Sequence, residues 1–317
     1  MGAQLRVYRR RIRSVQSTKK ITKAMELIAA SRIVKAQARM KAARPYANEL
    51  TRALAALGKN ATLKHPMLTG VENPRRTGIL IITSDRGLAG GYNANALRTA
   101  NELADRLTRE GREVERYVIG RKGAGYYRFR RIELAGSWTG FFEQPNFKDA
   151  REATETVTAA LEATSEGQTE DGKPGIDELW IVYTRFVNSV SQTPQAVKVS
   201  PVGEATQGDG DSDDDDSSGD GKDDTPVQYE FEPEASSLVA ALLPRYISSR
   251  IFSALLESAA SESAARRRAM KSASDNATDL IKTYTRLANQ ARQAEITQEL
   301  SEIVGGADAL AAAGSED

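Results

Sequence analysis

The sequence predicts an α/β fold combined with long helices: an antiparallel coiled coil of the N- and C-terminal helices and a central Rossmann-like α/β domain. Two observations predict it. Both ends of the chain are almost free of glycine and proline and carry apolar residues at heptad spacing, which is typical of coiled coils. The middle alternates short apolar runs with helical patterns, which is typical of a βαβ sheet. The predicted segments are a helix at 1–60, the α/β domain at 61–234 and a helix at 235–317.

The first segment is predicted to be one long helix. From Leu5 to Leu57 it contains no glycine and one proline, Pro45, where we expect a kink because proline removes a backbone donor. Apolar or small residues recur there at alternating steps of three and four, a heptad seam. They are Ile33, Ala36, Met40, Ala43, Ala47, Leu50, Leu54 and Leu57. Upstream, Ile21, Met25 and Ile28 follow the same rhythm, with a phase slip before Ile33.

The last segment repeats this pattern. Between Ala235 and Val304 there is no glycine and one proline, Pro244, and the pair Gly305–Gly306 is predicted to end the helix. Its expected seam is Ala277, Leu280, Tyr284, Leu287, Ala291, Ala294 and Gln298. Two such helices can bury their seams on each other. The stretch 19–37 also carries apolar residues outside one narrow seam, which predicts a second partner for that helix.

The middle segment contains four predicted strands and two predicted helices. The strands are residues 78–83, 114–120, 178–184 and 195–202, and the helices are 93–110 and 148–165. Two polar stretches are predicted to be solvated insertions. Residues 166–175 are rich in turn formers, and residues 203–226 hold ten acidic residues against Lys222. The acidic stretch has too few apolar groups to offset its ordering entropy, so we expect it to be disordered.

Composition excludes several kinds of chemistry. There is no cysteine, which excludes disulfides and thiol catalysis, and the single histidine, His65, precedes a proline in a loop and is expected to be a plain polar residue. No run of 18 apolar residues and no apolar N-terminal block is present, so we expect a soluble protein on the cytoplasmic side. Residues 1–60 carry fifteen basic and two acidic residues, which predicts an acidic or anionic partner.

The strongest enzymatic candidate is the glycine-rich turn TSDRGLAGGYN at 83–93. A turn between a strand and a helix can cradle phosphate. This one matches neither GxxxxGK[ST] nor GxGxxG, so the favoured interpretation is a tight turn whose polar residues cap backbone groups. A nucleotide-binding enzyme that uses residues 84–91 remains the alternative. Asp213–Asp216 lacks the loop order of a calcium site and is interpreted as a solvated charge run.

The basic N-terminal helix leaves two further alternatives open. It could bind the phosphates of a nucleic acid, although its charges are interleaved with apolar residues and no nucleic-acid-binding motif is present. It could also lie on a membrane surface, although its heptad partner at the C-terminus occupies one face. No cofactor or metal site is predicted.

Five stretches resemble the gamma subunit of F-type ATP synthase, the central rotor stalk. They are RIRSVQSTKKITKAMELIAASRIVKAQ (11–37), ITSDRGLAGGYNAN (82–95), YTRFVNSVSQTP (183–194), SESAARRRAMKSASDNA (261–277) and ARQAEITQELSEIVGGADAL (291–310). They cover nearly the whole chain, and the last is the most specific. Pro244 departs from the family pattern and implies a kink or a later helix start. The longer 166–175 loop resembles the actinobacterial branch, and the cysteine-containing insert of chloroplast members is missing.

The resemblance implies a non-catalytic subunit that couples proton-driven c-ring rotation to ATP synthesis or hydrolysis on the beta subunits. Its implied partners are the alpha3beta3 ring, the epsilon subunit and the c-ring, with no nucleic acid, and with the membrane reached only through the complex at its cytoplasmic face. Implied contact or coupling residues are Met25, Glu262 and Arg266, facing beta, and Gln293, Thr297 and Glu299, facing the ring. The alternative for Met25 is plain seam packing. The apolar tip at 300–310 is expected to sit in a hydrophobic sleeve of the ring.

Overall fold

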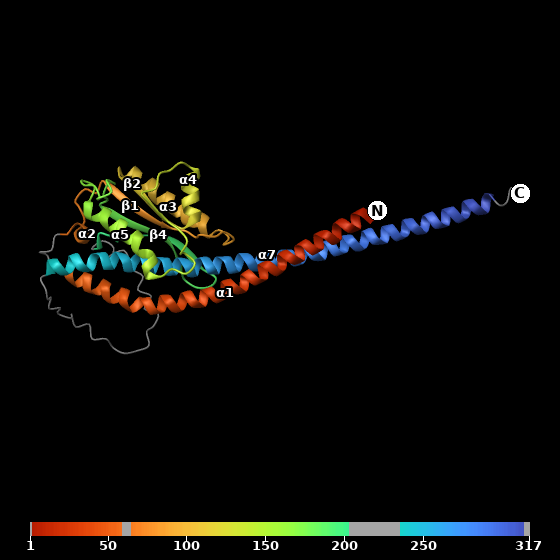
Figure 1. Cartoon of the computed structure of the whole chain (residues 1–317), viewed down its shortest axis with the longest axis horizontal. Helices are drawn as coiled ribbons and strands as arrows, with labels where there is room; N and C mark the ends of the chain where they lie inside the picture. Colours follow the sequence, from red (N-terminus) through yellow and green to blue (C-terminus); the bar gives the residue numbers. More distant parts are fainter. Residues whose placement is uncertain (1, 59–64, 203–234, 314–317) are drawn as a thin grey trace. The chain divides into compact units, whose positions relative to one another are not determined.

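The computed structural model describes residues 2–58, 65–202 and 235–313 (Figure 1). The chain forms two compact units: Met1–Ala29 with Arg266–Asp317, called unit 1, and Ala30–Ala265, called unit 2. The two long helices, α1 (Gly2–Gly58) and α7 (Ala235–Ala313), each belong partly to both units. The contacts therefore divide the chain differently from the three predicted segments. The acidic stretch 203–226 lies outside the described residues.

Unit 2 is built on a five-stranded sheet in the order β3-β2-β1-β4-β5. The strands are β1 (Arg76–Ile82), β2 (Glu113–Ile119), β3 (Gly136–Trp138), β4 (Glu178–Phe186) and β5 (Gln192–Ser200). β1 to β4 pair in parallel, and β5 runs antiparallel to β4. The four predicted strands are confirmed. β3 was missed because three residues carry too little pattern to be recognised.

The short helices of unit 2 are α2 (Pro66–Thr69), α3 (Tyr92–Arg109), α4 (Arg121–Phe129) and α5 (Phe147–Ala163). The helices predicted at 93–110 and 148–165 are α3 and α5. A capping box formed by Asn146 and Asp149 starts α5, which satisfies donors that a helix N-terminus leaves unpaired. The sequence analysis missed α4, because glycines inside it lower its helix propensity.

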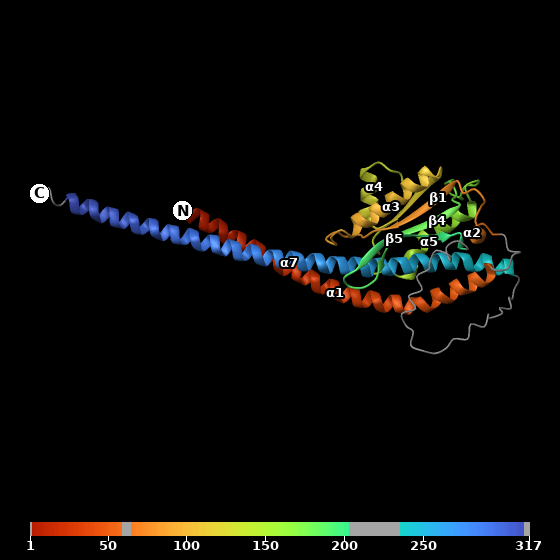
Figure 2. The same ribbon diagram turned by 180° about the vertical axis from the view of Figure 1, so that it is seen from behind.

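Each face of the sheet has its own core. On one face, Ile79, Ile81 and Val118 pack against α3 and α4. On the other face, Leu80, Ile82 and Ile181 share a core with α5 and with the unit 2 portions of α1 and α7 (Figures 1 and 2). The side chains that the two long helices supply to this core are Leu50, Leu54 and Leu57 from α1 and Leu243, Ile247 and Ile251 from α7. Within unit 2 the long helices therefore complete a layered α/β core.

By length and composition alone, α7 is apolar enough to cross a membrane. Half of the window that passes this test is buried inside the protein. Leu243, Ile247 and Leu255 are fully buried there, as expected for the core helix of a folded domain. Core packing therefore accounts for the apolar residues that α7 carries within unit 2.

Unit 1 is an antiparallel pair of helices. Near the boundary with unit 2, the hydroxyls of Thr22 and Ser274 are 2.7 Å apart and hydrogen-bonded. Farther along, the rings of Tyr8 and Tyr284 stack with centroids 6.4 Å apart, and the Arg11 guanidinium lies over Tyr284. Because the numbers rise on α1 while they fall on α7, the helices run in opposite directions. The predicted antiparallel coiled coil is confirmed in this unit, and the fold class with it.

The predicted register of the seam is partly wrong. Ile21, Ile28 and Leu280 are exposed, whereas Thr22 and Ala29 are buried. On α7, Ala277 is buried and Tyr284 and Ala291 are half-buried, but Ala294 and Gln298 are exposed. The buried positions of α1, Thr22, Ala29, Ile33 and onward, keep one heptad phase, so the phase slip is absent. The apolar pattern gave the wrong phase because a polar residue, Thr22, occupies the seam there, where its hydroxyl is hydrogen-bonded to that of Ser274.

Neither proline nor glycine interrupts the long helices. Pro45 lies inside α1, and Pro244 and the pair Gly305–Gly306 lie inside α7. The predictions of a later start for α7 and of an end at Gly305 are therefore wrong. The unit 2 portion of α1 is curved in both views (Figures 1 and 2), consistent with the hydrogen bond that an internal proline removes. Tertiary packing of apolar side chains, rather than intrinsic helix propensity, keeps these segments helical.

Candidate subunit-contact surfaces

The glycine-rich turn after β1 is occupied by its own backbone. The Asp85 carboxylate accepts backbone N–H bonds from Arg121 (3.0 Å), Gly140 (2.8 Å) and Phe142 (3.2 Å). The Ser84 N–H donates to Asn93 Oδ1 at 2.9 Å, and the Ser84 hydroxyl donates to the Arg86 carbonyl. These polar groups bind other parts of the same chain, so they are already occupied and do not face a phosphate or a nucleophile. The structural interpretation of this turn is confirmed.

The same turn also requires a glycine at position 120. Thr83 Oγ1 accepts the N–H of Gly123 at 2.9 Å and donates to the Ile119 carbonyl. Gly120 has φ 104°, and a Cβ there would lie 2.1 Å from the Thr83 carbonyl oxygen. Only glycine allows both this conformation and this approach. The carboxyl edge of the sheet is therefore a rigid junction of three loops.

His65 has a structural role. Its Nδ1 accepts the N–H of Met67 at 3.3 Å and caps α2. Burial lowers the pKa of His65, and the Glu162 carboxylate opposes that effect. Among the residues that the structure describes, no cluster of three or more His, Cys, Asp or Glu could hold a metal ion.

Met25 lies on the unit 1 portion of α1, where it is half-buried. Ile21 and Ile28, which lie four and three residues from Met25 and therefore on its side of the helix, are 58% and 54% exposed. Large apolar side chains exposed this close together are typical of protein contact sites. The surface left over from the seam, which the sequence predicted, is therefore present around Met25.

Glu262 and Arg266 are buried, at 1% and 6% exposure. Glu262 belongs to unit 2 and Arg266 to unit 1. Burial, with the nearby Glu262 carboxylate as a further cause, raises the pKa of Tyr92 far above its ordinary value. Neither residue presents its side chain to solvent in the chain by itself, whereas the next two residues of α7, Arg267 and Arg268, are exposed.

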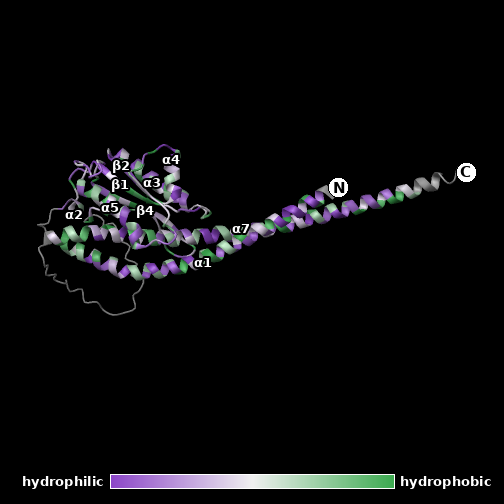
Figure 3. Ribbon diagram, viewed as in Figure 1, coloured by the Kyte–Doolittle hydropathy of each residue, from purple (hydrophilic) through white to green (hydrophobic). Residues whose placement is uncertain are grey.

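Gln293, Thr297 and Glu299 are exposed on the distal part of α7. There α7 extends beyond the N-terminal end of α1 as a single helix (Figures 1 and 2). Its exposed apolar side chains are Ile296, Leu300, Ile303 and Val304. Their spacing of four, three and one places them on one stripe. Figure 3 shows apolar and polar residues mixed along both helices of unit 1. The side chains beyond residue 307 lie outside the description.

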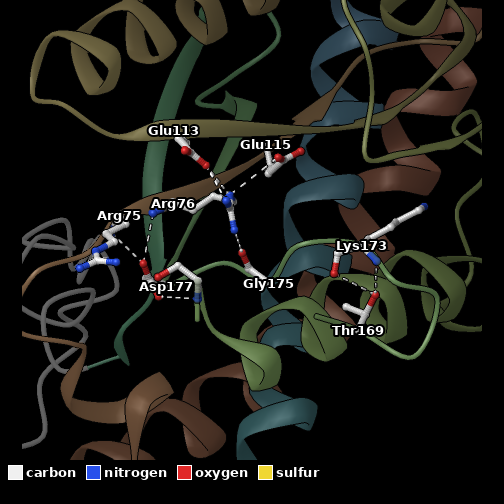
Figure 4. A network of polar contacts seen from close by, with 9 residues as sticks. Arg75, Arg76, Glu113, Glu115, Thr169, Lys173, Gly175 and Asp177 are labelled. Carbon is white, nitrogen blue, oxygen red and sulfur yellow. Dashed lines mark hydrogen bonds and ion pairs between the residues drawn. The ribbon is translucent and has the colours of Figure 1, made fainter. Parts of the chain in front are cut away.

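A polar network around Asp177, which the sequence did not predict, lies at the end of the sheet where β1 and β4 begin (Figure 4). The Asp177 carboxylate accepts the backbone N–H groups of Arg75 (2.7 Å), Arg76 (3.1 Å) and Ser165 (2.8 Å). Burial opposes ionisation, but these bonds outweigh it and lower the pKa of Asp177. The Arg76 guanidinium also donates to the Gly175 carbonyl and pairs with Glu113. This network holds both ends of the 166–175 loop.

The 166–175 loop is exposed, as predicted, but it is also ordered by hydrogen bonds. The Thr169 N–H donates to the Lys173 carbonyl at 2.8 Å, and Lys173 N–H donates to the Thr169 hydroxyl (Figure 4). Lys173 Nζ reaches the Ala135 carbonyl at 2.8 Å. Turn-forming residues favour hydrogen bonds of this kind within a short segment. The loop is a small hairpin attached to the sheet.

An α/β domain and an antiparallel pair of long helices with exposed apolar side chains are typical of a subunit that contacts other chains. A family model described as ATP synthase matches residues 4–310. The ATP synthase gamma chain of Saccharopolyspora erythraea is 54% identical, over 99% of this chain and 100% of that one. The gamma chain of Frankia casuarinae is 55% identical, over 98% and 99%.

The chain belongs to the ATP synthase gamma chain family, and the expected likeness to actinobacterial members is confirmed. It is a non-catalytic subunit of ATP synthase. A chain of the Euglena gracilis mitochondrial ATP synthase (OSCP/F1/c-ring) has the same fold, with a TM-score of 0.66 over 98% of this chain and 95% of that one, at 19% identity.

Proposed function

We propose that this gamma chain is the rotating central stalk of F1, which couples proton-driven rotation of a c-ring to ATP synthesis or hydrolysis on the beta subunits. The observation that carries the proposal is the antiparallel pairing of the two chain ends in unit 1, at Thr22–Ser274 and Tyr8–Tyr284. Twisting or separating the helices would expose their seam, at a cost of about 25 cal/mol for each Å² of apolar surface. The pairing therefore resists twisting and separation of the two helices.

A stalk must also treat three beta subunits unequally. A ligand shifts a conformational equilibrium only through different interactions with the states. The exposed side chains of unit 1 are uneven: apolar residues gather around Met25 on α1, and basic residues such as Arg267 and Arg268 lie on α7. Each beta subunit would meet a different surface at each angle of rotation. The beta sites would thereby pass through different affinities in turn.

The contact residues are assigned within this proposal. Met25, Glu262 and Arg266 contact beta, and Gln293, Thr297 and Glu299 contact or tune the ring, in which the apolar stripe from Ile296 to Val304 lies. Exposure supports the last three and the surroundings of Met25. The burial of Glu262 and Arg266 means that a contact with beta requires their side chains to turn outward.

The remaining partners follow from the same assignment. We assign the α/β domain to the foot that meets the epsilon subunit and the c-ring, so that the chain reaches the membrane only through the complex, at its cytoplasmic face. The fifteen basic residues among the first 60 suit acidic loops of beta. Attraction of this kind weakens as ionic strength rises.

Rotation of the assembled complex tests the proposal. The chain contains no cysteine, so Phe129→Cys, at a side chain 85% exposed on the α/β domain, provides a unique attachment point for a bead. With alpha and beta fixed to a surface, we expect ATP to drive unidirectional rotation of the bead. Hydrolysis at a normal rate with a stationary bead would refute the proposal.

A further inference from the structure

One carboxylate joins three segments of unit 2 that are far apart in the sequence. Glu143, in the loop between β3 and α5, accepts a hydrogen bond from Arg32 Nη1 of α1 through Oε2 at 2.7 Å. Its other oxygen, Oε1, lies 3.0 Å from Arg86 Nε in the glycine-rich turn. The three residues are separated by loops and strands, so only the fold brings them together.

Of the two ion pairs that Glu143 makes, the pair with Arg32 is the stronger, because it is less exposed to solvent than the pair with Arg86. The side chains of Arg32 and Glu143 are 25% and 17% exposed, whereas that of Arg86 is 72% exposed. Partly buried charges are screened less than charges at the open surface. A charge-assisted hydrogen bond is also short and directional.

The position of Glu143 is fixed by its neighbours. Asp85, next to Arg86, binds the N–H groups of Gly140 and Phe142. The Phe142 ring is fully buried. The turn thus holds the Glu143 loop through its backbone, while the Glu143 side chain points back to the turn and to α1. Because the carboxylate is held on both sides, it is a preorganised anchor and has little freedom to follow a moving helix.

The bridge lies where α1 leaves unit 2, because Arg32 is the third residue of α1 within this unit. A comparable attachment holds α7 close to its own exit at Ala265. There the Ser261 hydroxyl donates to the Thr184 carbonyl at 2.9 Å, and the Thr184 N–H donates to the Ser258 hydroxyl at 3.3 Å. Both long helices are therefore tied by polar bonds to the carboxyl edge of the sheet.

We propose that Glu143 is a positioning residue that locks α1 to the α/β domain, so that twist applied to the domain passes into both helices of the stalk. Apolar packing already resists rotation of α1 about its axis, and a directional hydrogen bond where each helix leaves unit 2 adds to that resistance. The inference rests on the proposed function as a rotor.

The test compares variants in the assembled, membrane-reconstituted complex. Glu143→Gln keeps the shape and removes the charge, Arg32→Gln removes the other partner, and Arg32→Lys keeps a cation. Glu155→Gln is the matched control, because it removes a carboxylate from an exposed ion pair with Arg151 on α5. The readouts are protons translocated per ATP hydrolysed, amide hydrogen exchange of residues 30–40, and assembly yield.

We expect Glu143→Gln to speed exchange at residues 30–40 about tenfold, as for loss of a charge-assisted bond, and to lower proton translocation per ATP with assembly yield unchanged. Arg32→Lys should restore most of the coupling lost in Arg32→Gln. The double variant Glu143→Gln/Arg32→Gln should be no worse than either single one, as for two residues that act together. Glu155→Gln should match the unmodified chain.

Wild-type coupling in Glu143→Gln, or additive losses in the double variant, would overturn the inference, as would a loss of coupling explained by lost assembly. Rotation of the unmodified complex distinguishes a failure of the inference about Glu143 from a failure of the proposed function. If the unmodified complex rotates and Glu143→Gln behaves like it, only the role of Glu143 falls. If the unmodified complex does not rotate, the proposed function falls.

Discussion

At the scale of single residues, several buried polar side chains form hydrogen bonds with the chain's own backbone. Asp85, Asp177 and Thr83 each bind N–H groups of distant segments. Such bonds satisfy groups that a loop would otherwise leave unpaired. This explains why a turn as polar as TSDRGLAGGYN carries no reactive centre, since its side chains are committed to folding.

Asp177 gives the α/β domain a measurable acid sensitivity. Its pKa is lowered in the folded protein, so the stability it contributes is present above the unfolded pKa, about 3.9, and is lost as pH falls through the folded value. Asp177→Asn should lower the free energy of unfolding at pH 7 by about 1–2 kcal/mol and flatten its dependence on acid pH. Asp171→Asn, in the exposed loop, is the control and should leave the denaturation curve unchanged. Equal curves for both variants would contradict this role.

Gly120 is a sharper test of the junction. Gly120→Ala would force a Cβ to within 2.1 Å of a carbonyl oxygen at φ 104°, so we expect a loss of about 3 kcal/mol or more in unfolding free energy. The control is Gly125→Ala, inside α4, where a Cβ meets nothing within 4 Å. That change should be neutral or stabilising by up to about 1 kcal/mol. The expectation fails if chemical denaturation shows both variants to be equally stable.

At the scale of elements, heptad spacing predicted both long helices and their pairing, but not their register. Ala277, Tyr284 and Ala291 were assigned correctly to the seam, while Ile21, Ile28 and Leu280 were not. Spacing detects a period, and a stripe with apolar residues on several sides has more than one possible phase. The correct phase depends on Thr22 finding Ser274 across the interface. A bond between residues 252 positions apart leaves no local signal, and neither does the Arg32–Glu143 bridge.

The polar pair in the seam makes a prediction about energetics. Thr22→Val alone takes from the buried Ser274 hydroxyl its partner and should cost about 1–3 kcal/mol, whereas Ser274→Ala alone leaves the Thr22 hydroxyl its bond to the Lys19 carbonyl and should cost less. The double variant should cost less than the sum of the two, because no polar group is then stranded. Thermal unfolding of the four proteins gives the coupling. Additive losses would mean that the two hydroxyls do not depend on each other.

The apolar surface around Met25 gives a further prediction for α1. Met25→Lys adds a charge at the proposed contact with beta and should lower the coupling of ATP hydrolysis to proton pumping more than it lowers assembly. Gln16→Lys adds the same charge at another exposed position of the helix and should change neither. The measurement is protons pumped per ATP in membrane vesicles. Equal ratios in Met25→Lys and the unmodified chain would contradict the assignment.

At the scale of the whole molecule, the division into two units fits the proposed rotor, in which unit 2 is assigned to the foot and unit 1 to the axle. The sheet and its two cores belong to unit 2, and the paired chain ends belong to unit 1. α1 and α7 pass through both, so no separate linker is needed to carry torque. The sequence predicted the fold class, though not the division into these two units, because long uninterrupted helices and alternating strands have strong periodic signals. The anchoring residues were missed, since they depend on three-dimensional proximity alone.

The most direct test cross-links the two ends of the chain. Because the chain has no cysteine of its own, Thr22→Cys/Ser274→Cys places the only two thiols where the native hydroxyls are 2.7 Å apart. Oxidation should join them in nearly every molecule, and the cross-linked complex should still rotate and pump protons, because a stalk that turns as one rigid body does not need its helices to move against each other. Failure of the link to form, or rotation that stops when it forms and returns on reduction, would contradict the account.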